Sequence, residues 1–267
     1  MSSIAAAPAF VDFRNVWLAY DGQADFAVED ISLSIRPGEF IAIVGPSGCG
    51  KSTFMKLATG LKPPSKGEVD VEGRRVDGPL KIVGMAFQAP TLLPWRTTLD
   101  NVLLPLEIVE PYRSTFKRDR EAFADRARAL LKTVGLEGYE DKFPWQLSGG
   151  MQQRASICRA LVHDPAVLLM DEPFGALDAM TRERMNLELQ RIWSETRKTV
   201  VFITHSIPEA VFLADRVLVM TERPGAIAAI YDVPLPRPRS LDTMSDPVFT
   251  EMVARIRKHF FTQGTLD

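Results

Sequence analysis

Short apolar runs dominate the first part of the chain. Residues 11–20 and 27–35 have the composition of strands, and a turn-forming Asp-Gly pair separates them. Residues 40–44 are continuously apolar and bounded by Gly and Pro, a pattern typical of a strand that is buried on both faces. Residues 51–59 follow with the pattern of a helix that ends at a glycine. These patterns predict an antiparallel β region, then a buried strand that leads into a helix.

The middle of the chain changes to helical spacing. From about residue 90 to residue 155 the sequence is rich in Leu, Arg and Glu, and its apolar residues recur at helical intervals. One such stripe consists of Phe123, Ala127, Leu130, Leu131 and Val134. We expect this segment to form a helical subdomain inserted into an α/β core.

Strands and helices alternate in the following part. We expect strands at 167–170, 200–204 and 217–221, and helices at 151–162, 180–196 and 208–214. Strands that alternate with helices imply right-handed crossovers and a parallel sheet. The predicted fold class is therefore α/β, with a mainly parallel sheet, an N-terminal antiparallel β region and the inserted helical subdomain.

The last part of the chain has a third pattern. From about residue 233 it is Pro-rich, which suits an extended linker. Asp246 and Pro247 have the pattern of a helix cap and a first helical position. One apolar face follows, formed by Val248, Phe249, Met252, Val253 and Ile256. We therefore predict a main domain at 11–232 and a linker with an amphipathic helix at 233–267.

Composition and charge narrow the functional classes. The net charge is -2 and the sequence pI is about 6.0, whereas a nucleic-acid-binding protein normally has a basic excess, so we expect no nucleic-acid partner. The two cysteines, Cys49 and Cys158, are expected to be free thiols. No run approaches the ~18 apolar residues that a membrane-spanning helix needs. If the protein works at a membrane, another chain must supply the span.

A glycine-rich loop connects the buried strand at 40–44 to the helix at 51–59. Its sequence fits the P-loop pattern and consists of Gly45, Pro46, Ser47, Gly48, Cys49, Gly50, Lys51 and Ser52. The glycines let the backbone wrap closely, so that main-chain amides and the helix N-terminus can cradle phosphate groups. Lys51 can reach the β- and γ-phosphates, and the Ser52 hydroxyl can ligate Mg²⁺. In this strand-loop-helix context the motif predicts nucleotide binding and a P-loop NTPase core.

Two carboxylates end the predicted strand at 167–170. Successive side chains of a strand point to opposite faces, so Asp171 and Glu172 cannot do the same job. Asp171 can face a metal ion, while Glu172 can polarise a water molecule beside the γ-phosphate. The alternative is a solvated acidic strand end, which the P-loop in the same chain disfavours.

A second phosphate-binding element is predicted at Ser148, Gly149 and Gly150. Ser148 can cap a helix whose first turn presents amides beside two glycines. The chain thus has two predicted phosphate-binding elements, of which one is a P-loop and the other is this serine loop. A head-to-tail pair of chains, in which each serine loop closes on the ATP of the other, accounts for both. A helix cap with no further role also fits the Ser-Gly-Gly sequence taken alone.

The segment that contains Ser148 resembles the signature motif of the ABC ATPases. It has the sequence Leu147-Ser148-Gly149-Gly150-Met151-Gln152-Gln153-Arg154, with Met where the family often has Gln. The resemblance covers residues 11–221, with the motifs in the family's order. It implies an ATPase that uses ATP and Mg²⁺ and dimerises. The implied ATP-binding residues are Tyr20, Gly45, Pro46, Ser47, Gly48, Cys49, Gly50, Lys51, Ser52 and Thr53, and from the partner chain Ser148, Gly149, Gly150 and Gln152.

Four residues take their roles from this resemblance alone. Tyr20 lies where the family has an aromatic residue that stacks on adenine, although a strand-end Tyr is equally often a packing residue. Gln88 matches the loop glutamine that contacts Mg²⁺ and senses the permease. Asp178, in Ala176-Leu177-Asp178, matches a loop that lines the dimer interface, and His205 matches the switch histidine that contacts the γ-phosphate. The implied catalytic residues are Lys51, Glu172 and His205, and the implied Mg²⁺ ligands are Ser52, Gln88 and Asp171.

Three further segments resemble the importer branch that handles nitrate, sulfonates, taurine or bicarbonate. They are Leu92-Leu93-Pro94-Trp95, residues 174–178 and residues 206–210. The implied function is to power the import of a small solute, such as one of these anions, through a separate membrane permease. The implied partners are a second copy, permease subunits and, indirectly, a solute-binding protein, at the cytoplasmic face of the inner membrane. The Leu-Leu-Pro-Trp segment either docks on the permease or packs inside the helical subdomain.

Two other functions are compatible with the motifs. A soluble ABC ATPase that acts on nucleic acid or the ribosome usually has long coiled-coil insertions, tandem cassettes or a basic surface, and this chain has one cassette and a net charge of -2. A nucleotide-binding regulator without turnover would not need both Glu172 and His205. A phosphate-release assay separates the regulator from an ATPase.

Overall fold

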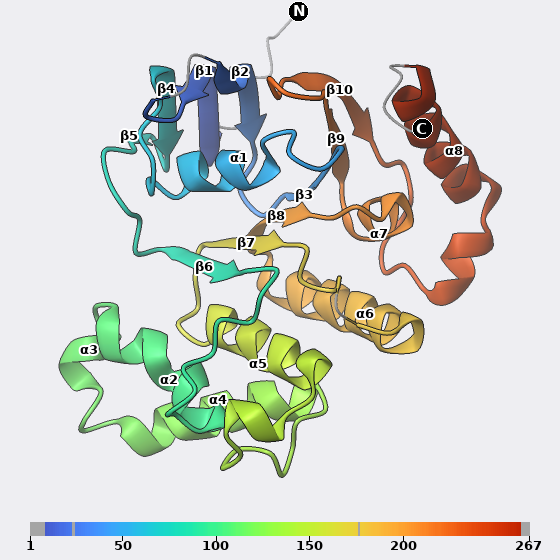
Figure 1. Cartoon of the computed structure of the whole chain (residues 1–267). Helices are drawn as coiled ribbons and strands as arrows, with labels where there is room; N and C mark the ends of the chain where they lie inside the picture. Colours follow the sequence, from blue (N-terminus) through green and yellow to red (C-terminus); the bar gives the residue numbers. More distant parts are fainter. Residues whose placement is uncertain (1–8, 23–24, 176, 263–267) are drawn as a thin grey trace, which may run out of the picture. The chain divides into compact units, whose positions relative to one another are not determined.

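Two compact units make up the described part of the chain, which comprises residues 9–22, 25–175 and 177–262 of the computed structural model (Figure 1). The first unit contains the residues up to Leu80, Arg197–Pro236 and the residues from Asp242 onward. The second contains Lys81–Thr196 and Arg237–Leu241. These boundaries differ from the predicted ones, which divide the chain into a main domain at 11–232 and a linker with a helix at 233–267. That division and the helical subdomain at about 90–155 stay predictions.

Four antiparallel strands form one sheet of the first unit, in the order β2-β1-β4-β5. They are β1 (Val11–Ala19), β2 (Phe26–Ile35), β4 (Lys66–Val71) and β5 (Arg74–Arg75). In β1, Val11 and Phe13 are buried while Arg14 is exposed, as expected of a sheet with one covered face. A register shift after Phe13 keeps Val16 and Leu18 on the buried side. The antiparallel region is confirmed, and β4 and β5 extend it.

The remaining strands of the first unit have the order β10-β9-β3-β8. Three are parallel, namely β3 (Phe40–Val44), β8 (Thr199–Ile203) and β9 (Arg216–Met220), and β10 (Ile227–Asp232) is antiparallel to β9. Every residue of β3 and β8 is buried. The continuously apolar run at 40–44 is therefore the buried parallel strand that its sequence predicts.

Three helices complete the first unit: α1 (Lys51–Ala58), α7 (Ile207–Leu213) and α8 (Pro247–Thr262). The ring of Phe54 on α1 stacks on that of Phe13 on β1, with 4.4 Å between ring centroids, and thereby ties the helix to the antiparallel sheet. α8 packs against α7 (Figure 1), and its Phe249, Met252 and Ile256 are buried. The buried face of α8 is narrower than the predicted apolar face, because Val248 is exposed.

The second unit is mainly helical. Its strands β6 (Val83–Ala86) and β7 (Val167–Asp171) are parallel, and its helices are α2 (Thr98–Ile108), α3 (Tyr112–Thr115), α4 (Arg120–Thr133), α5 (Gly149–Leu161) and α6 (Ala179–Thr196). A short 3-10 turn lies at Pro144–Gln146, and another, at Leu241–Ser245, begins at the last residue of this unit and continues into the first. α5 packs against α2, α4 and β6. On α4, Ala124, Ala127 and Leu131 are buried, whereas Phe123 and Leu130 of the predicted stripe are half-buried.

The Pro-rich segment after β10 is held to α6. The side-chain amide of Gln190 donates to the carbonyl of Arg239 at 2.7 Å and accepts from its N–H at 2.8 Å. The Arg237 guanidinium lies 4.1 Å from the ring centroid of Trp193. Residues 237–239 of the predicted linker therefore belong to the second unit and are fixed by side chains of α6.

His163 is a buried titratable group at the end of α5. Its Nε2 lies 3.3 Å from the carbonyl oxygen of Val83, and its Nδ1 has no hydrogen-bond partner. Burial lowers the pKa of His163. An unfolded histidine titrates near a pH of about 6.5, so below that value the unfolded chain takes up a proton more readily than the folded one. Stability is therefore lost as the pH falls below about 6.5.

Replacing His163 with Gln should make the fold less sensitive to acid. Glutamine can donate to the Val83 carbonyl but does not titrate, so the melting temperature should fall less between about pH 7.5 and about pH 5.5 than it does in the parent. Thermal unfolding at the two pH values measures this difference. Equal losses in the two proteins would show that another group is responsible.

Candidate functional site

The side chain of Lys51 closes the glycine-rich loop that follows β3. Its ammonium group donates to the carbonyl oxygens of Gly45 and Pro46, both at 2.8 Å, and the residue is buried. Gly48 and Gly50 have φ angles of 77° and 96°, in the left-handed region that favours glycine. The first N–H groups of α1 have no acceptor within the helix. Together with the ammonium they make this loop an anion-binding element.

The loop is packed too tightly for a side chain at its last glycine. A Cβ on Gly50 would lie 2.5 Å from Cγ1 of Val28, and a Cβ on Gly225 would lie 1.8 Å from the carbonyl oxygen of Cys49. The Cys49 thiol is buried, and burial raises its pKa although the Lys51 ammonium acts in the opposite direction. Cys49 therefore fills the loop with its side chain and can reach a ligand only through its main chain. Cys49 and Cys158 are both free thiols, as predicted.

His205 follows the strand next to β3. Ile43 of β3 lies opposite Ile203 of β8, and the amide of Thr204 donates to the Ile43 carbonyl at 3.2 Å. The glycine loop and His205 therefore both follow the carboxyl ends of neighbouring parallel strands. His205 is exposed, while the Thr204 hydroxyl donates to Glu209 at 2.6 Å and fixes the turn into α7. The first unit thus brings the histidine to the same strand ends as the loop.

Tyr20 lies just after β1 and is half-buried. Its hydroxyl is 3.1 Å from Oγ1 of Thr53 on α1, and the ammonium group of Lys56 donates to it at 3.3 Å. The aromatic residue predicted to stack on adenine is thereby tied to the helix that begins at the glycine loop.

Gln88 and Glu172 meet beyond the ends of β6 and β7. Ala86 is paired with Met170, so the residues two positions further on lie close together. Nε2 of Gln88 donates to Oε2 of Glu172 at 3.1 Å. Because the amide nitrogen is engaged in this way, the amide oxygen of Gln88 is the atom that can ligate a cation. Glu172 has a φ angle of 49°, which is uncommon for a residue other than glycine and recurs at functional sites. Asp171 ends β7 and is half-buried.

Ser148 caps α5. Its hydroxyl accepts a hydrogen bond from the amide of Met151 at 3.3 Å, and both Ser148 and Gly149 are exposed. The side-chain amide of Gln152 donates to the carbonyls of Pro144 at 3.0 Å and Leu147 at 3.3 Å. Gln152 therefore holds the preceding loop in place, and the exposed N-terminus of a 13-residue helix lies beside it.

Two residues that sequence reasoning missed hold the loop around Gln88. Gln153 donates to the carbonyl of Phe87 at 2.9 Å, and Arg159 donates to the carbonyls of Pro90 at 2.8 Å and Thr91 at 2.9 Å. Both side chains come from α5, and Gln153 is 1% exposed. The signal in the sequence was weak, because polar residues on a helix usually face solvent.

Asp178 caps α6. Its carboxylate accepts from the amide of Thr181 at 2.9 Å, and this contact with the main chain holds the pKa of Asp178 below its usual range. A Cβ on Gly150 would lie 3.0 Å from Cδ2 of Leu177, so Leu177 packs on the first turn of α5. Ala176 lies outside the described residues. The interface role of Asp178 stays a prediction.

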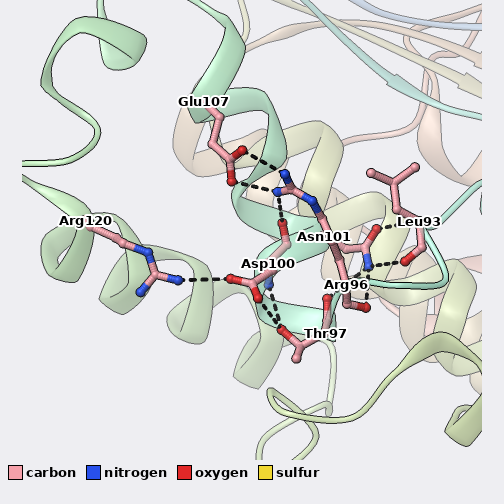
Figure 2. A network of polar contacts seen from close by, with 7 residues as sticks. All are labelled: Leu93, Arg96, Thr97, Asp100, Asn101, Glu107 and Arg120. Carbon is pink, nitrogen blue, oxygen red and sulfur yellow. Dashed lines mark hydrogen bonds and ion pairs between the residues drawn. The ribbon is translucent and has the colours of Figure 1, made fainter.

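Trp95 is 70% exposed. Its ring therefore does not pack inside the helical part of this chain, which was one of the two alternatives for the Leu-Leu-Pro-Trp segment. Figure 2 shows how the segment that bears it is held. The buried side chain of Asn101 accepts from the amide of Leu93 at 2.7 Å and donates to three main-chain carbonyls of residues 93–97. Arg96 forms two hydrogen bonds with the Glu107 carboxylate, at 2.7 and 3.0 Å. The backbone on either side of Trp95 is thus fixed while its ring is exposed.

The candidate residues are divided between the two units. The first unit contains Tyr20, the loop from Gly45 to Thr53, and His205. The second contains Gln88, Ser148 to Gln152, Asp171, Glu172 and Asp178. Within the described ranges no three His, Cys, Asp or Glu side chains are grouped to hold a metal ion. The predicted Mg²⁺ ligands would not form such a group, because only one of them is a carboxylate.

A family model described as "ABC transporter" matches residues 28–175, which is more than half of the chain. This range includes the glycine loop, Gln88, the Ser148 loop and the Asp171-Glu172 pair. The chain belongs to the ABC transporter family. No helix in the part of this ABC protein that the structure describes combines the length and apolar content needed to cross a membrane.

Three curated relatives match over most of their length. A taurine import ATP-binding protein from Rhizobium johnstonii is 43% identical, and the match covers 92% of this chain and 94% of the relative. An aliphatic sulfonates import ATP-binding protein from Bacillus licheniformis is 41% identical, and the match covers 90% of this chain and 89% of the relative. A nitrate import ATP-binding protein from Synechococcus elongatus is 44% identical, and the match covers 85% of this chain and 81% of the relative.

A solved structure shares the fold of this ABC protein. It is the dimeric, post-hydrolysis state of an ATP-binding cassette with ADP and Pi, and it is 32% identical with a TM-score of 0.73. The match covers 85% of this chain and 100% of the other. The predicted family, fold class and ATPase activity are confirmed.

Glu172→Gln should separate ATP binding from hydrolysis. The new amide oxygen can still accept from Gln88, but it is not a base, so ATP should bind while phosphate release falls by a factor of at least about 100. Nucleotide binding and phosphate release, measured on the same preparation, test this expectation. Lys51→Ala is the control and should weaken ATP binding itself. Hydrolysis at the parent rate by the Glu172 variant would show that another group activates the water.

Proposed function

We propose that this ABC protein is the ATP-hydrolysing subunit of an importer for a small solute, an anion such as nitrate, a sulfonate or taurine. The hydrogen bond between Gln88 and Glu172 carries the proposal, because it joins the predicted metal sensor to the predicted base. The direction of transport and the class of solute are supported by the relatives named for import of these compounds. The same names favour import over a role on nucleic acid or the ribosome.

In the proposed reaction, water attacks the γ-phosphate of ATP and the products are ADP and phosphate. Lys51 and the amides of the glycine loop bind the phosphates and offset the charge that develops on them. Glu172 accepts the proton of the attacking water. His205 donates a hydrogen bond to the γ-phosphate. Each group therefore acts on the phosphate or on the water, and none forms a covalent intermediate.

Magnesium is the cation that the donor set fits best. The proposed ligands are the Ser52 hydroxyl, the amide oxygen of Gln88 and the Asp171 carboxylate. All three are hard oxygen donors, which Mg²⁺ prefers, and a few protein ligands with several waters are typical of its sites. The orientation of the Gln88 amide, with its nitrogen on Glu172, supports this assignment. When bound, the ion supplies positive charge that offsets the charge of the phosphates.

A head-to-tail homodimer is the proposed active form. Ser148 and Gly149 are exposed at the N-terminus of α5, where main-chain amides and the helix dipole favour an anion. In the proposed dimer, Ser148, Gly149, Gly150 and Gln152 of each chain close on the ATP that the other chain holds, and Asp178 lies at the interface. The dimeric solved cassette supports this arrangement.

The proposed membrane partner is the permease. An exposed Trp on a fixed backbone is typical of an interface anchor, and the Trp95 segment follows Gln88 within a few residues. A cytoplasmic loop of the permease would dock there, with the ATPase peripheral at the cytoplasmic face of the membrane. A solute-binding protein would act indirectly, by delivering the solute to the permease.

Mixing two inactive variants tests the shared sites. Lys51→Ala and Ser148→Arg should each abolish hydrolysis as homodimers, but a mixed dimer has one intact site because both lesions fall on the other. A 1:1 mixture should recover about a quarter of the parent rate, since half of the dimers are mixed and each has one intact site of two. Mixing Lys51→Ala with the doubly substituted chain should recover nothing. No recovery despite demonstrated mixed dimers would count against shared sites.

Trp95→Ala tests the docking site. Because the ring is exposed, its truncation should cost less than about 1 kcal/mol of stability. Binding to the permease should weaken by about tenfold or more, and permease-stimulated hydrolysis should fall with it. The control is Ile108→Ala, which removes a side chain that is 61% exposed on α2. Unchanged co-purification and stimulation, measured for both variants, would remove Trp95 from the interface.

A further inference from the structure

The hydroxyl of Tyr20 is held by two side chains of α1. Lys56 donates to it at 3.3 Å, and it lies 3.1 Å from Oγ1 of Thr53. An ammonium group can only donate, so the Tyr20 oxygen accepts from Lys56 and its own hydrogen can go to Thr53. The three groups form a directed chain of hydrogen bonds from Lys56 through Tyr20 to Thr53, in which each bond polarises the next.

Both hydrogen bonds engage the hydroxyl group at the tip of the Tyr20 side chain. The Lys56 ammonium is 5.3 Å from the ring centroid but only 3.3 Å from the hydroxyl oxygen. The ammonium is therefore nearer to the hydroxyl oxygen than to the centre of the ring.

The helix that holds Tyr20 also begins at the phosphate-binding loop. Lys51 starts α1, and Thr53 and Lys56 lie three positions apart, on one side of the helix. Thr53 is buried, and the stacking of Phe54 on Phe13 fixes α1 against the strand that leads to Tyr20. One rigid helix thus relates the position of the tyrosine ring to that of the phosphate cradle.

We propose that Lys56 is a positioning residue for the purine base of the bound nucleotide. Through the Tyr20 hydroxyl it holds the ring in the orientation that stacks on the base. This inference rests on the proposed ATP-binding function and adds a residue that contacts neither the base nor the phosphates. It also explains why a Tyr, with its hydroxyl, suits this strand end better than a Phe.

Comparing two ligands separates the base from the phosphates. Calorimetric titration would use ATP and inorganic tripolyphosphate, which has the phosphates but no base. Lys56→Met should weaken ATP binding about three- to tenfold, the usual effect of losing one hydrogen bond, and leave tripolyphosphate binding unchanged. Tyr20→Phe should weaken ATP binding by a similar factor. Lys56→Arg, which can still donate, should restore most of the affinity for ATP.

Two further variants test whether Lys56 acts through the hydroxyl. In a Tyr20→Phe background, Lys56→Met should have little additional effect, because its acceptor is already gone. Lys62→Met removes the same charge from a partly exposed lysine that lies 3.9 Å from Asp21, and it should leave the affinity for both ligands unchanged. Melting temperatures of all variants verify that the fold is retained.

Three results would overturn the proposal. The first is an unchanged affinity of Lys56→Met for ATP. The second is an equal loss for ATP and tripolyphosphate, which would mean that Lys56 acts as a charge on the phosphates. The third is a full effect of Lys56→Met in the Tyr20→Phe background. If the parent protein bound neither ligand, the proposed ATP-binding function itself would fail, which is a distinguishable outcome.

Discussion

The buried ammonium group of Lys51 constrains the first unit of this ABC protein. An ammonium group is costly to bury unless its hydrogen bonds are supplied, and the carbonyls of Gly45 and Pro46 supply two of them. The loop can present these carbonyls only by turning through left-handed φ angles at Gly48 and Gly50. The absence of a side chain at Gly50 lets Val28 pack at close range, and the absence of one at Gly225 leaves room for the carbonyl of Cys49. The phosphate cradle is therefore shaped by contacts within the chain.

Parallel strand pairs place the remaining chemistry. In the first unit, β3 and β8 end side by side, so the loop and His205 follow adjacent strands. In the second, β6 and β7 end side by side, and Gln88 reaches Glu172. α5 links two features of the second unit, because Ser148 caps its N-terminus and its Gln153 and Arg159 side chains hold the loop of Gln88. A change at the start of α5 can therefore be transmitted to that loop through direct hydrogen bonds.

The sequence predicted the elements whose pattern is unmistakable. β3 has the predicted bounds, and α1 ends one residue before the predicted end, because a continuous apolar run and a glycine stop leave little choice. β4 was missed because Lys66, Glu68 and Asp70 are uncommon in strands. β10 was missed because its sequence, Ile-Ala-Ala-Ile-Tyr-Asp, does not alternate between apolar and polar residues. Strand alternation predicted the role of Glu172 and resemblance to a family that of Gln88, but their hydrogen bond depends on strand register. The exposure of Trp95 depends on the Asn101 contacts, which no local pattern encodes.

We propose that this chain hydrolyses ATP in sites that two copies share. The most direct measurement is the rate of phosphate release per chain, with ATP and Mg²⁺, over a range of protein concentrations that spans the monomer and the dimer. Shared sites predict that the rate per chain is low where the monomer prevails, rises with concentration and reaches a plateau as the dimer forms. A rate per chain that stays constant down to concentrations at which only monomer is present, or no phosphate release at any concentration, would contradict the account.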